Sequence, residues 1–356
     1  MKILITGICG FVGSALACAL RDAFDSTQLQ IIGIDNLSRP GSEINRRGLR
    51  SIGAEFLHAD LRMPSDIEAV GDVDWVIDAA ANPSVLAGVG GRGTSRQLVE
   101  HNLIGTVNIL EYCKARKCGL ILLSTSRVYS VPALASVRVE IADDAFRPLA
   151  GADQPEGLTA DGITEQFSTA PPVSLYGATK LASEQLSLEY GESFGFDVWI
   201  NRCGVLAGAG QFGHAEQGIF SYWIQSWVQN APLRYIGFDG QGRQVRDCLH
   251  PRDLVPLLHK QMTVADRRRE RIVNLGGGTA NSLSLSRLSE WCAERFGPRK
   301  VMSDTTARPF DAPWIVMNAR LAEELWDWRV QTPVAAVLDE IAAHAESHPQ
   351  WLDLVH

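Results

Sequence analysis

Near its N-terminus the chain reads Thr6-Gly7-Ile8-Cys9-Gly10-Phe11-Val12-Gly13. An apolar run over residues 2–6 precedes this stretch and predicts a β-strand, while residues 11–24 have the apolar spacing of a helix. Glycines between a strand and a helix permit a tight turn and let the backbone approach a pyrophosphate, which the positive end of the helix dipole attracts. The stretch therefore predicts a dinucleotide-binding loop, with cofactor contacts from Gly7, Gly10, Phe11 and Gly13.

An acidic residue at the end of the next apolar run supports this interpretation. The run covers residues 30–34 and ends in Asp35. A carboxylate there accepts hydrogen bonds from the adenosine ribose and repels a 2′-phosphate, so the sequence favours NAD over NADP, with Arg39 nearby as the residue that argues the other way. Asn36 is expected to bind the cofactor as well. Asp60 follows the third apolar run, where it either faces the adenine or is an ordinary turn residue.

Short apolar runs and helix-like stretches alternate through the first half of the chain, as residues 74–78, 99–117 and 120–124 illustrate. This alternation is typical of βαβ units and predicts an α/β fold with a doubly wound, Rossmann-type parallel sheet. A length of 356 residues suggests about two domains. We expect an NAD-binding domain over residues 1–203, with return segments near 243–275, and a smaller, mainly substrate-binding α+β region over residues 204–356.

Composition argues against several other classes of protein. The formal net charge of −8 does not suit a protein that coats nucleic acid. The seven cysteines form no C-x-x-C pair and no pattern with zinc spacing, which predicts a reducing, cytoplasmic environment, no disulfide framework and no metal site. Glycines interrupt the apolar N-terminal run, and no later segment has roughly 18 apolar residues in a row, so neither a signal peptide nor a membrane span is expected.

A second motif, Tyr176-Gly177-Ala178-Thr179-Lys180, begins a predicted helix that runs to about residue 192. The i, i+4 spacing puts Tyr176 and Lys180 on one helix face. A free tyrosine has a pKa of about 10 and is a poor base at neutral pH, but an ammonium group one turn away and a positive nicotinamide would stabilise its phenolate. Tyr176 could then take a proton from a sugar hydroxyl as hydride leaves the carbon. Alone, the motif also fits an exposed helix pair with no catalytic role.

Hydroxyl side chains end the apolar run over residues 120–124, in the stretch Ser124-Thr125-Ser126-Arg127-Val128-Tyr129. Ligands bind at this end of the strands of a parallel sheet, so Thr125 could share the substrate hydrogen bond with Tyr176. The stretch over residues 131–173 is rich in Pro, Ala, Asp and Gly and has weak periodicity. A loop of that length is uncommon in a compact domain and usually functional.

Together these motifs resemble the extended short-chain dehydrogenase/reductase family, and its nucleotide-sugar epimerases in particular, over nearly the whole chain. The sequence is most similar to the subgroup of CDP-paratose 2-epimerases. The segments that carry the subgroup resemblance are Asp35-Asn36-Leu37-Ser38-Arg39, Gly162-Ile163-Thr164-Glu165, Ser174-Leu175-Tyr176-Gly177, Gln217-Gly218, Gln244-Val245-Arg246-Asp247 and Asn281-Ser282-Leu283-Ser284. The resemblance implies NAD-dependent epimerisation of a nucleotide-diphosphate sugar through a keto-sugar, by a homodimer or homotetramer. The C2 position of a CDP-linked deoxyhexose is implied by the subgroup alone.

The resemblance also implies roles at the reacting centre. Thr125 matches the family's catalytic Ser/Thr, Tyr176 its base and Lys180 the partner of that tyrosine. Tyr176 and Lys180 are expected at the cofactor too, together with Ala79 and Asn102. Asn102 belongs to the stretch Asn102-Leu103-Ile104-Gly105-Thr106, where it also fits a purely structural role in its helix.

For the substrate, the resemblance points to two arginines. Arg246 and Arg308 match positions that hold the diphosphate, for which a guanidinium group offers bidentate contacts. A surface salt bridge is the alternative for each. Further substrate contacts are expected from Ser84, Ser126, Arg127 and Gln217.

Several departures from the family pattern leave the exact sugar open. Asp78-Ala79-Ala80 stands where the family has His-x-Ala, Ser130 replaces a glycine, Ala207-Gly208 replaces Tyr-Gly, and residues 88–93 are unusually rich in glycine. A 4-epimerase, a 4,6-dehydratase and a decarboxylase are alternatives on the same scaffold. Dehydratases of the family carry Asp-Glu after the catalytic threonine, and this chain has Ser126 and Arg127 there. A non-catalytic NAD-binding protein is a further alternative, which the Thr125, Tyr176 and Lys180 set argues against.

Overall fold

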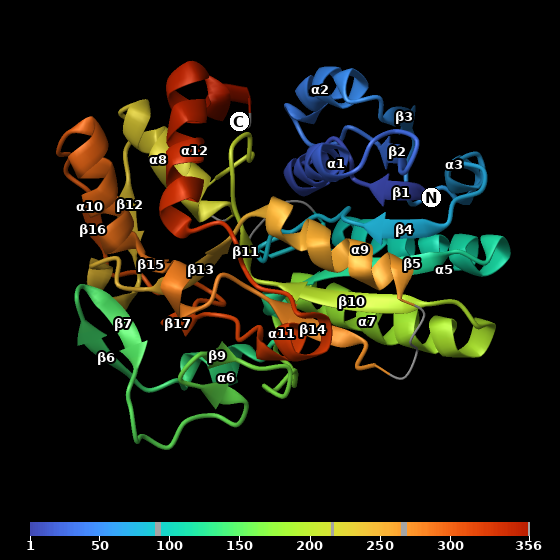
Figure 1. Cartoon of the computed structure of the whole chain (residues 1–356). Helices are drawn as coiled ribbons and strands as arrows, with labels where there is room; N and C mark the ends of the chain where they lie inside the picture. The colour runs from blue at the N-terminus through green and yellow to red at the C-terminus, as the bar shows by residue number, and fades with distance from the viewer. Residues whose placement is uncertain (90–93, 215–216, 265–268, 355–356) are drawn as a thin grey trace.

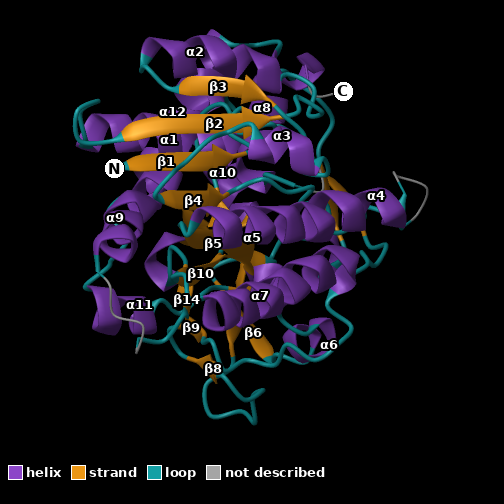
Figure 2. Ribbon diagram, turned by 90° about the vertical axis from the view of Figure 1, so that its right-hand side faces the viewer, coloured by secondary structure: helices purple, strands orange, loops and turns teal. Residues whose placement is uncertain are grey.

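The computed structural model describes residues 1–89, 94–214, 217–264 and 269–354. A seven-stranded sheet forms its centre, in the order β14-β10-β5-β4-β1-β2-β3 (Figure 1 and Figure 2). All neighbouring pairs are parallel, which confirms the predicted α/β fold with a Rossmann-type sheet. The strands are β1 Lys2–Thr6, β2 Gln30–Asp35, β3 Glu55–His58, β4 Trp75–Asp78, β5 Gly119–Thr125, β10 Val198–Cys203 and β14 Ile272–Leu275.

Helices cover both faces of the sheet (Figure 2). Along β1, Ile3 and Ile5 are buried against one layer of helices, and Leu4 is buried against the other. Strands covered on both faces need apolar residues at every position, which explains the near-continuous apolar runs. The first layer contains α1 Phe11–Ala23, α2 Asn45–Ser51, α9 Val255–Thr263 and α11 Arg320–Trp326, and the second contains α3 Pro64–Glu68, α5 Gly105–Arg116 and α7 Ser174–Phe194.

The strand order reverses at the centre of the sheet. The chain runs outward from β1 through β2 to β3, and then returns to form β4 on the other side of β1. In open parallel sheets, the crevice outside the carboxyl ends of the strands at such a reversal is where ligands bind. The glycine loop follows β1 and residues 79–81 follow β4, so both border this crevice.

A smaller region with its own apolar core lies beside the large sheet (Figure 1). Phe220, Trp223, Leu288 and Ile341 are buried in that core, where three helices pack together. The helices are α8 Ile219–Val228, α10 Leu285–Phe296 and α12 Val334–Ser347. They accompany a sheet of β11 Val205–Leu206, β13 Val245–Leu249, β15 Ser282–Ser284 and β17 Trp314–Ile315, and a pair formed by β12 Arg234–Ile236 and β16 Met302–Asp304.

Residues 131–173 do not form the single long loop that the sequence predicted. They contain the short helix α6 Val131–Ala135 and two antiparallel hairpins, β6 Val139–Ala142 with β7 Ala145–Pro148 and β8 Leu158–Thr159 with β9 Gly162–Ile163. Ile163 is fully buried, and its amide donates to the Val316 carbonyl at 2.8 Å. Phe167 is buried in the same apolar cluster. Strands of two to four residues are too short to produce a detectable alternation, which is why the prediction of one loop was wrong.

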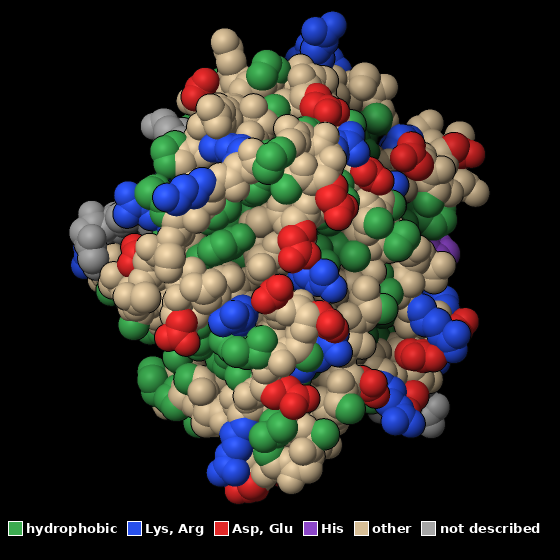
Figure 3. Space-filling view, turned by 90° about the vertical axis from the view of Figure 1, so that its left-hand side faces the viewer, with side chains coloured by type: hydrophobic (Ala, Val, Ile, Leu, Met, Phe, Trp, Pro, Cys, Tyr) green, Lys and Arg blue, Asp and Glu red, His purple; other side chains and the backbone are tan. Residues whose placement is uncertain are grey.

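The surface carries mixed charges. On the face shown in Figure 3, basic and acidic side chains are interspersed with apolar ones, without a broad area of one sign. Within the described part of the chain, no helix combines the length and apolarity needed to cross a membrane.

A buried carboxyl group in β13 makes stability depend on pH. Asp247 is fully buried, and its Oδ2 atom accepts hydrogen bonds from the amides of Gly277 at 2.9 Å and Met317 at 3.4 Å. Burial nevertheless raises the pKa of Asp247 to about 7. An acid with a higher pKa in the folded protein binds its proton more tightly when folded. Its contribution to the free energy of unfolding is therefore complete below the unfolded pKa of about 4 and is lost as the pH rises toward 7.

We expect Asp247→Asn to remove this pH dependence. As the pH rises from 4 to 7, the variant should gain stability over the unmodified protein by up to roughly 1.4 kcal/mol per pH unit. Urea unfolding at a series of pH values measures the difference. Asp153→Asn, at an exposed position, is the matched control. Parallel stability curves for Asp247→Asn and the unmodified protein would contradict the assignment.

Candidate active site

A deep cavity opens at the carboxyl ends of the central strands. Its walls include the glycine loop, the ends of β2 and β5, and the start of α7. The opposite wall comes from the smaller region, through residues 204–206, 211–212, 217–220 and 308–311. The cavity therefore lies between the two parts of the molecule, at the strand reversal. Of the predicted site residues, those that line it are Gly7, Gly10, Phe11, Gly13, Asp35, Asn36, Asp60, Ala79, Thr125, Ser126, Arg127, Tyr176, Gln217, Arg246 and Arg308.

The glycine loop leaves no room for side chains at two positions. Gly7 has a φ of +64°, and a Cβ atom there would lie 2.8 Å from Ala80 Cα. A Cβ atom at Gly13 would lie 2.3 Å from the Gly7 carbonyl oxygen. The chain can therefore turn tightly from β1 into α1, with the helix N-terminus aimed at the cavity. The glycine loop and the N-terminus of α1 together form a cradle that fits the pyrophosphate of a dinucleotide.

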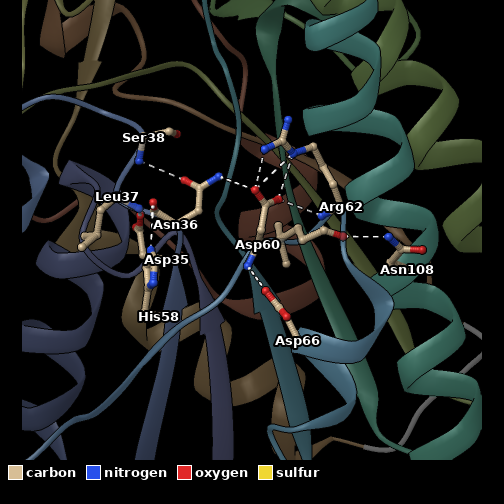
Figure 4. A network of polar contacts seen from close by, with 10 residues as sticks. Asp35, Asn36, Leu37, Ser38, His58, Asp60, Arg62, Asp66 and Asn108 are labelled. Carbon is tan, nitrogen blue, oxygen red and sulfur yellow. Dashed lines mark hydrogen bonds and ion pairs between the residues drawn. The ribbon is translucent and has the colours of Figure 1, made fainter.

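Two carboxylates stand at the adenosine end of the cradle (Figure 4). Asp35 accepts hydrogen bonds from the amides of Cys9 at 3.0 Å and Leu37 at 2.8 Å, while burial raises the pKa of its carboxyl group. Asp60 pairs with Arg62 at 2.6 Å and accepts from Asn36 Nδ2 at 3.2 Å. The hydrogen bond from Arg62 holds the pKa of Asp60 well below its usual range. Two negative charges therefore border the cavity where a ribose would lie.

Arg39 is held by the opposite wall of the cavity. Its guanidinium group donates to the Phe212 carbonyl at 2.5 Å and to Gln217 Oε1 at 3.3 Å. The structure thus places Gln217, predicted from the sequence as a substrate residue, in contact with the adenosine end. These bonds direct Arg39 across the cavity, which weakens the sequence argument that it would hold a 2′-phosphate.

This geometry predicts strong discrimination against NADP. The cofactor extracted from the purified protein by denaturation should be NAD. Replacement of Asp35 by Ala should shift the NAD/NADP affinity ratio toward NADP by ~10-fold or more, equivalent to about 1.4 kcal/mol, because it removes the charge that repels a 2′-phosphate. Ratios of dissociation constants measured by fluorescence quenching test this, with the exposed Asp153→Ala as a control outside the cavity lining. Extraction of NADP from the unmodified protein would contradict the prediction.

Thr125 and Tyr176 both line the cavity. Thr125 ends β5, and Tyr176 lies in the first turn of α7 with 7% of its surface exposed. Burial raises the pKa of Tyr176 to about 12, while the nearby Thr125 hydroxyl and the charge of Arg127 act in the opposite direction.

Lys180 lies one turn after Tyr176 in α7. It is only 2% exposed, does not line the cavity, and interacts electrostatically with Asp78 and Glu184. Burial lowers the pKa of Lys180, and those two carboxylates oppose the shift. The sequence predicted Lys180 as the cation that stabilises the Tyr176 phenolate, and that role stays a prediction.

Two other predicted residues lie outside the cavity lining. The Asn102 side chain accepts from the Asn82 amide at 2.8 Å, and its Nδ2 donates to Thr179 Oγ1 at 3.2 Å, so it ties α7 to the segment after β4. Ser84 belongs to a turn in which its carbonyl accepts from the Ala87 amide at 3.2 Å. The glycine-rich stretch over residues 88–93 lies partly outside the described residues, which omit 90–93.

Three arginines gather at the far end of the cavity. Arg246 forms an ion pair with Asp311 at 2.7 Å, and Arg127 donates to the Phe310 carbonyl at 3.2 Å. Arg308 lines the same end. Burial and the charges of Arg246 and Arg308 lower the pKa of Arg127 to about 10, so it remains cationic at neutral pH. One carboxylate among three guanidinium groups leaves a site that attracts anions such as a diphosphate.

Sequence reasoning missed Asp311 and Phe310 in this cluster. Asp311 is 65 residues from Arg246 in the chain, and the pairing depends on β13 and β17 lying side by side. No motif spacing links the two. The turn at Phe310, with a φ of +59°, likewise left no signal that a glycine would have given.

Comparison with known proteins gives a consistent result. The model of the NAD dependent epimerase/dehydratase family matches residues 3–276. CDP-paratose 2-epimerase of Salmonella typhi is 33% identical over 338 residues, which cover 92% of this chain and 94% of that protein. dTDP-glucose 4,6-dehydratase of Salmonella typhimurium is 26% identical over 290 residues, which cover 78% of this chain and 72% of that protein.

Solved structures share the fold. UDP-glucuronic acid 4-epimerase from Bacillus cereus, in complex with UDP-glucuronic acid and NAD, has a TM-score of 0.77 at 22% identity and covers 98% of this chain and 99% of its own. dTDP-glucose 4,6-dehydratase from Bacillus anthracis, in complex with NAD, has a TM-score of 0.77 at 21% identity and covers 100% of both chains. With the family match over most of the sequence, these findings lead to one conclusion: the chain belongs to the NAD-dependent epimerase/dehydratase family of nucleotide-sugar enzymes and uses NAD.

Proposed function

We propose that this enzyme epimerises a nucleotide-diphosphate sugar by transient oxidation to a keto-sugar, with inversion at C2 of a CDP-linked deoxyhexose. The observation that carries the reaction type is the position of the Thr125 and Tyr176 hydroxyls, between the dinucleotide cradle and the three-arginine cluster. A sugar whose diphosphate occupies the arginine cluster would present its ring to these hydroxyls. The choice of C2 and of cytidine is supported by the likeness to the CDP-paratose 2-epimerase of Salmonella typhi.

In the proposed mechanism, Tyr176 removes the proton from the sugar hydroxyl. Thr125 shares the hydrogen bond and holds that oxygen in line. Bound NAD supplies the acceptor, and later the donor, of the hydride. The keto-sugar intermediate reorients within the cavity so that the opposite face of its carbonyl group is presented for reduction. Tyr176 returns the proton to the oxygen when that face is reduced. Ala79 and the glycine loop would contact the cofactor, and Lys180 is proposed to lie beneath it.

The neighbouring reactions on this scaffold have less support. A 4-epimerase would use the same hydroxyls, so only substrate testing separates it from a 2-epimerase. Elimination of water needs an acid–base pair after the threonine, and Ser126 and Arg127 occupy those positions. Incubation with a panel of nucleotide sugars, read by mass spectrometry and NMR, is the direct test. Absence of any inverted product across the panel would overturn the proposal. A homodimer or homotetramer and a cytoplasmic location stay predictions.

The arginine cluster gives a prediction for substrate affinity. Arg246→Ala or Arg308→Ala should weaken binding of a nucleotide sugar by about 1.5–3 kcal/mol each, the usual value of a hydrogen bond to a charged group. Asp311 would also lose its partner in the Arg246 variant. NAD affinity should barely change in either. Isothermal titration measures both affinities, with the exposed Arg320→Ala as control. Unchanged sugar-nucleotide affinity in both variants would remove the cluster from substrate binding.

A further inference from the structure

We infer that Gln244 selects the nucleobase of the substrate by accepting a hydrogen bond from the 4-amino group of cytosine. This inference rests on the proposed function, in which the three-arginine cluster holds the diphosphate of a nucleotide sugar. Gln244 was not among the site residues predicted from the sequence, and its contacts in the smaller region support the new role.

The backbone places Gln244 on the same wall of the cavity as Arg246. Gln244 immediately precedes β13, and both residues line the cavity. Side chains two residues apart in an extended segment point to the same side, with their Cα atoms roughly 6–7 Å apart. Gln244 therefore lies one step along the wall from a guanidinium group that would bind the diphosphate.

Strand register shows on which side of Arg246 this step leads. In the large sheet, β10 pairs with β5 and ends opposite Thr125. The next strand, β11, pairs with residues 248–249 at the C-terminal end of β13. That end of β13 is thus the one nearer to the catalytic centre, and the chain leads from it back through Arg246 to Gln244. A sugar that reaches the catalytic hydroxyls from a diphosphate at Arg246 then leaves its nucleoside beside Gln244.

Hydrogen bonding fixes the orientation of the Gln244 amide. Its Nε2 atom donates to the Ile236 carbonyl at 2.8 Å. A carbonyl can only accept, so the nitrogen must face Ile236, which belongs to β12 and does not line the cavity. β12 lies on the side of the smaller region that faces away from the seven-stranded sheet (Figure 1). The amide oxygen, on the other branch of the side chain, is left for a ligand in the cavity.

The Gln244 oxygen lacks the partner that a buried acceptor needs. The residue is only 6% exposed, and its Oε1 atom is buried without a hydrogen-bond partner. A buried acceptor that is left unpaired costs free energy, and a ligand that supplies a donor recovers it. The amide therefore fits a ligand that presents an N–H group.

The neighbouring side chains suit an aromatic ring. Leu283 pairs with Arg246 across the ladder of β13 and β15, and continuation of this register brings Leu285 opposite Gln244. Both leucines line the cavity. The Ser284 hydroxyl between them is already engaged, since it donates to a backbone carbonyl at 2.9 Å and accepts from a backbone amide at 3.1 Å. An apolar surface with a free acceptor beside it is complementary to a flat base that carries a donor at its edge.

The fixed acceptor distinguishes the two pyrimidines. Cytosine carries an amino group at the 4-position, where uracil carries a carbonyl oxygen. Gln244 Oε1 can accept from the amino group, but it would face the uracil oxygen as a second acceptor. The amide cannot rotate to compensate without losing its bond to Ile236. Uridine would therefore leave two acceptors opposed and unpaired, which favours cytidine.

The test measures the dissociation constants of CDP and UDP for the NAD-bound enzyme by isothermal titration. The unmodified enzyme should bind CDP about tenfold more tightly than UDP. Gln244→Met keeps the length of the side chain and removes the acceptor, so CDP binding should weaken nearly to the level of UDP, while UDP binding changes by less than about twofold. Gln241→Met, at an exposed position in the same segment, is the matched control and should keep the preference for CDP.

The ratio of the two affinities separates base selection from a purely structural role. Loss of both affinities by the same factor in Gln244→Met would overturn the inference, because it would mean that the residue only supports the wall. Equal binding of CDP and UDP by the unmodified enzyme, or tighter binding of UDP, would overturn it as well. Circular dichroism and NAD retention verify the folding of each variant. Because nucleotide binding requires no turnover, a failure of the proposed epimerisation in the substrate panel is distinguishable from a failure of this inference.

Discussion

Tyr176→Phe is expected to abolish nearly all turnover while leaving the fold and NAD retention intact. The substitution removes one oxygen atom from a ring that remains packed among Val85, Ala87 and Leu98. Folding should change little, because the ring keeps these contacts and the lost hydroxyl belongs to the cavity lining. Proton transfer by a positioned side chain contributes about 10²–10⁴-fold to rate, and this contribution is lost with the Tyr176 hydroxyl.

The matched control is Tyr190→Phe. Tyr190 lies on the same helix, and its hydroxyl donates to Glu111 on the surface at 2.7 Å. Its loss should leave kcat within a few-fold of the unmodified value. Turnover of Tyr176→Phe within a few-fold of the unmodified enzyme, measured under the same conditions, would remove Tyr176 from the mechanism.

The fold of the larger part could be predicted because its strands and turns leave local signals. Strands covered on both faces are apolar at every position, as β1 and β5 illustrate. Gly7 and Gly13 are required by contacts within a short segment, so their spacing alone identifies the turn. Asp35 ends a strand that pairs in register with β1, which brings its carboxylate to the Cys9 amide.

The environment of Lys180 could not be predicted, since it depends on contacts between distant segments. The i, i+4 spacing correctly places Lys180 one turn after Tyr176 in α7. It does not reveal Asp78, which lies on β4 about a hundred residues earlier and stands where the family has histidine. Thr6 donates to Asp78 at 2.6 Å and fixes that carboxylate in the interior. The electrostatic environment of the catalytic helix therefore emerges only when β1, β4 and α7 are packed together.

The smaller α+β region was predicted from the sequence, but the pairing of its strands was not, for the same reason. Its sheet joins β13 to β15 and β17 across more than thirty intervening residues, with strands of two to five residues. Such strands are stabilised by burial of residues such as Trp314 and Ile315, not by local propensity. Arg246 and Asp311 come together only when this sheet forms. Their ion pair, and with it the net charge of the proposed diphosphate site, therefore could not be predicted from the sequence.

The proposed reaction type predicts where hydrogen isotopes should be found in the product. Inversion at a carbon that bears only a hydroxyl cannot proceed by direct loss of a proton, because such a carbon is far too weak an acid. Transient oxidation avoids this, since the hydrogen leaves as hydride and Tyr176 handles only the hydroxyl proton. The hydrogen taken from the carbon is then retained by the enzyme and returned to the same sugar molecule.

We therefore expect a substrate deuterated at the inverted carbon to keep its deuterium, and a reaction in heavy water to add none there. The experiment incubates the NAD-bound enzyme with CDP-paratose and other nucleotide sugars in heavy water, and NMR reads each ring position. Tyr176→Phe is the control for exchange that does not depend on catalysis. Solvent deuterium at the inverted carbon would rule out the oxidation route, because no solvent proton reaches that carbon on it. Inversion at C4 with C2 unchanged would contradict only the assignment to C2 and would leave the oxidation route in place. The reason is that the same Thr125 and Tyr176 hydroxyls can serve either carbon, depending on how the sugar ring is oriented in the cavity.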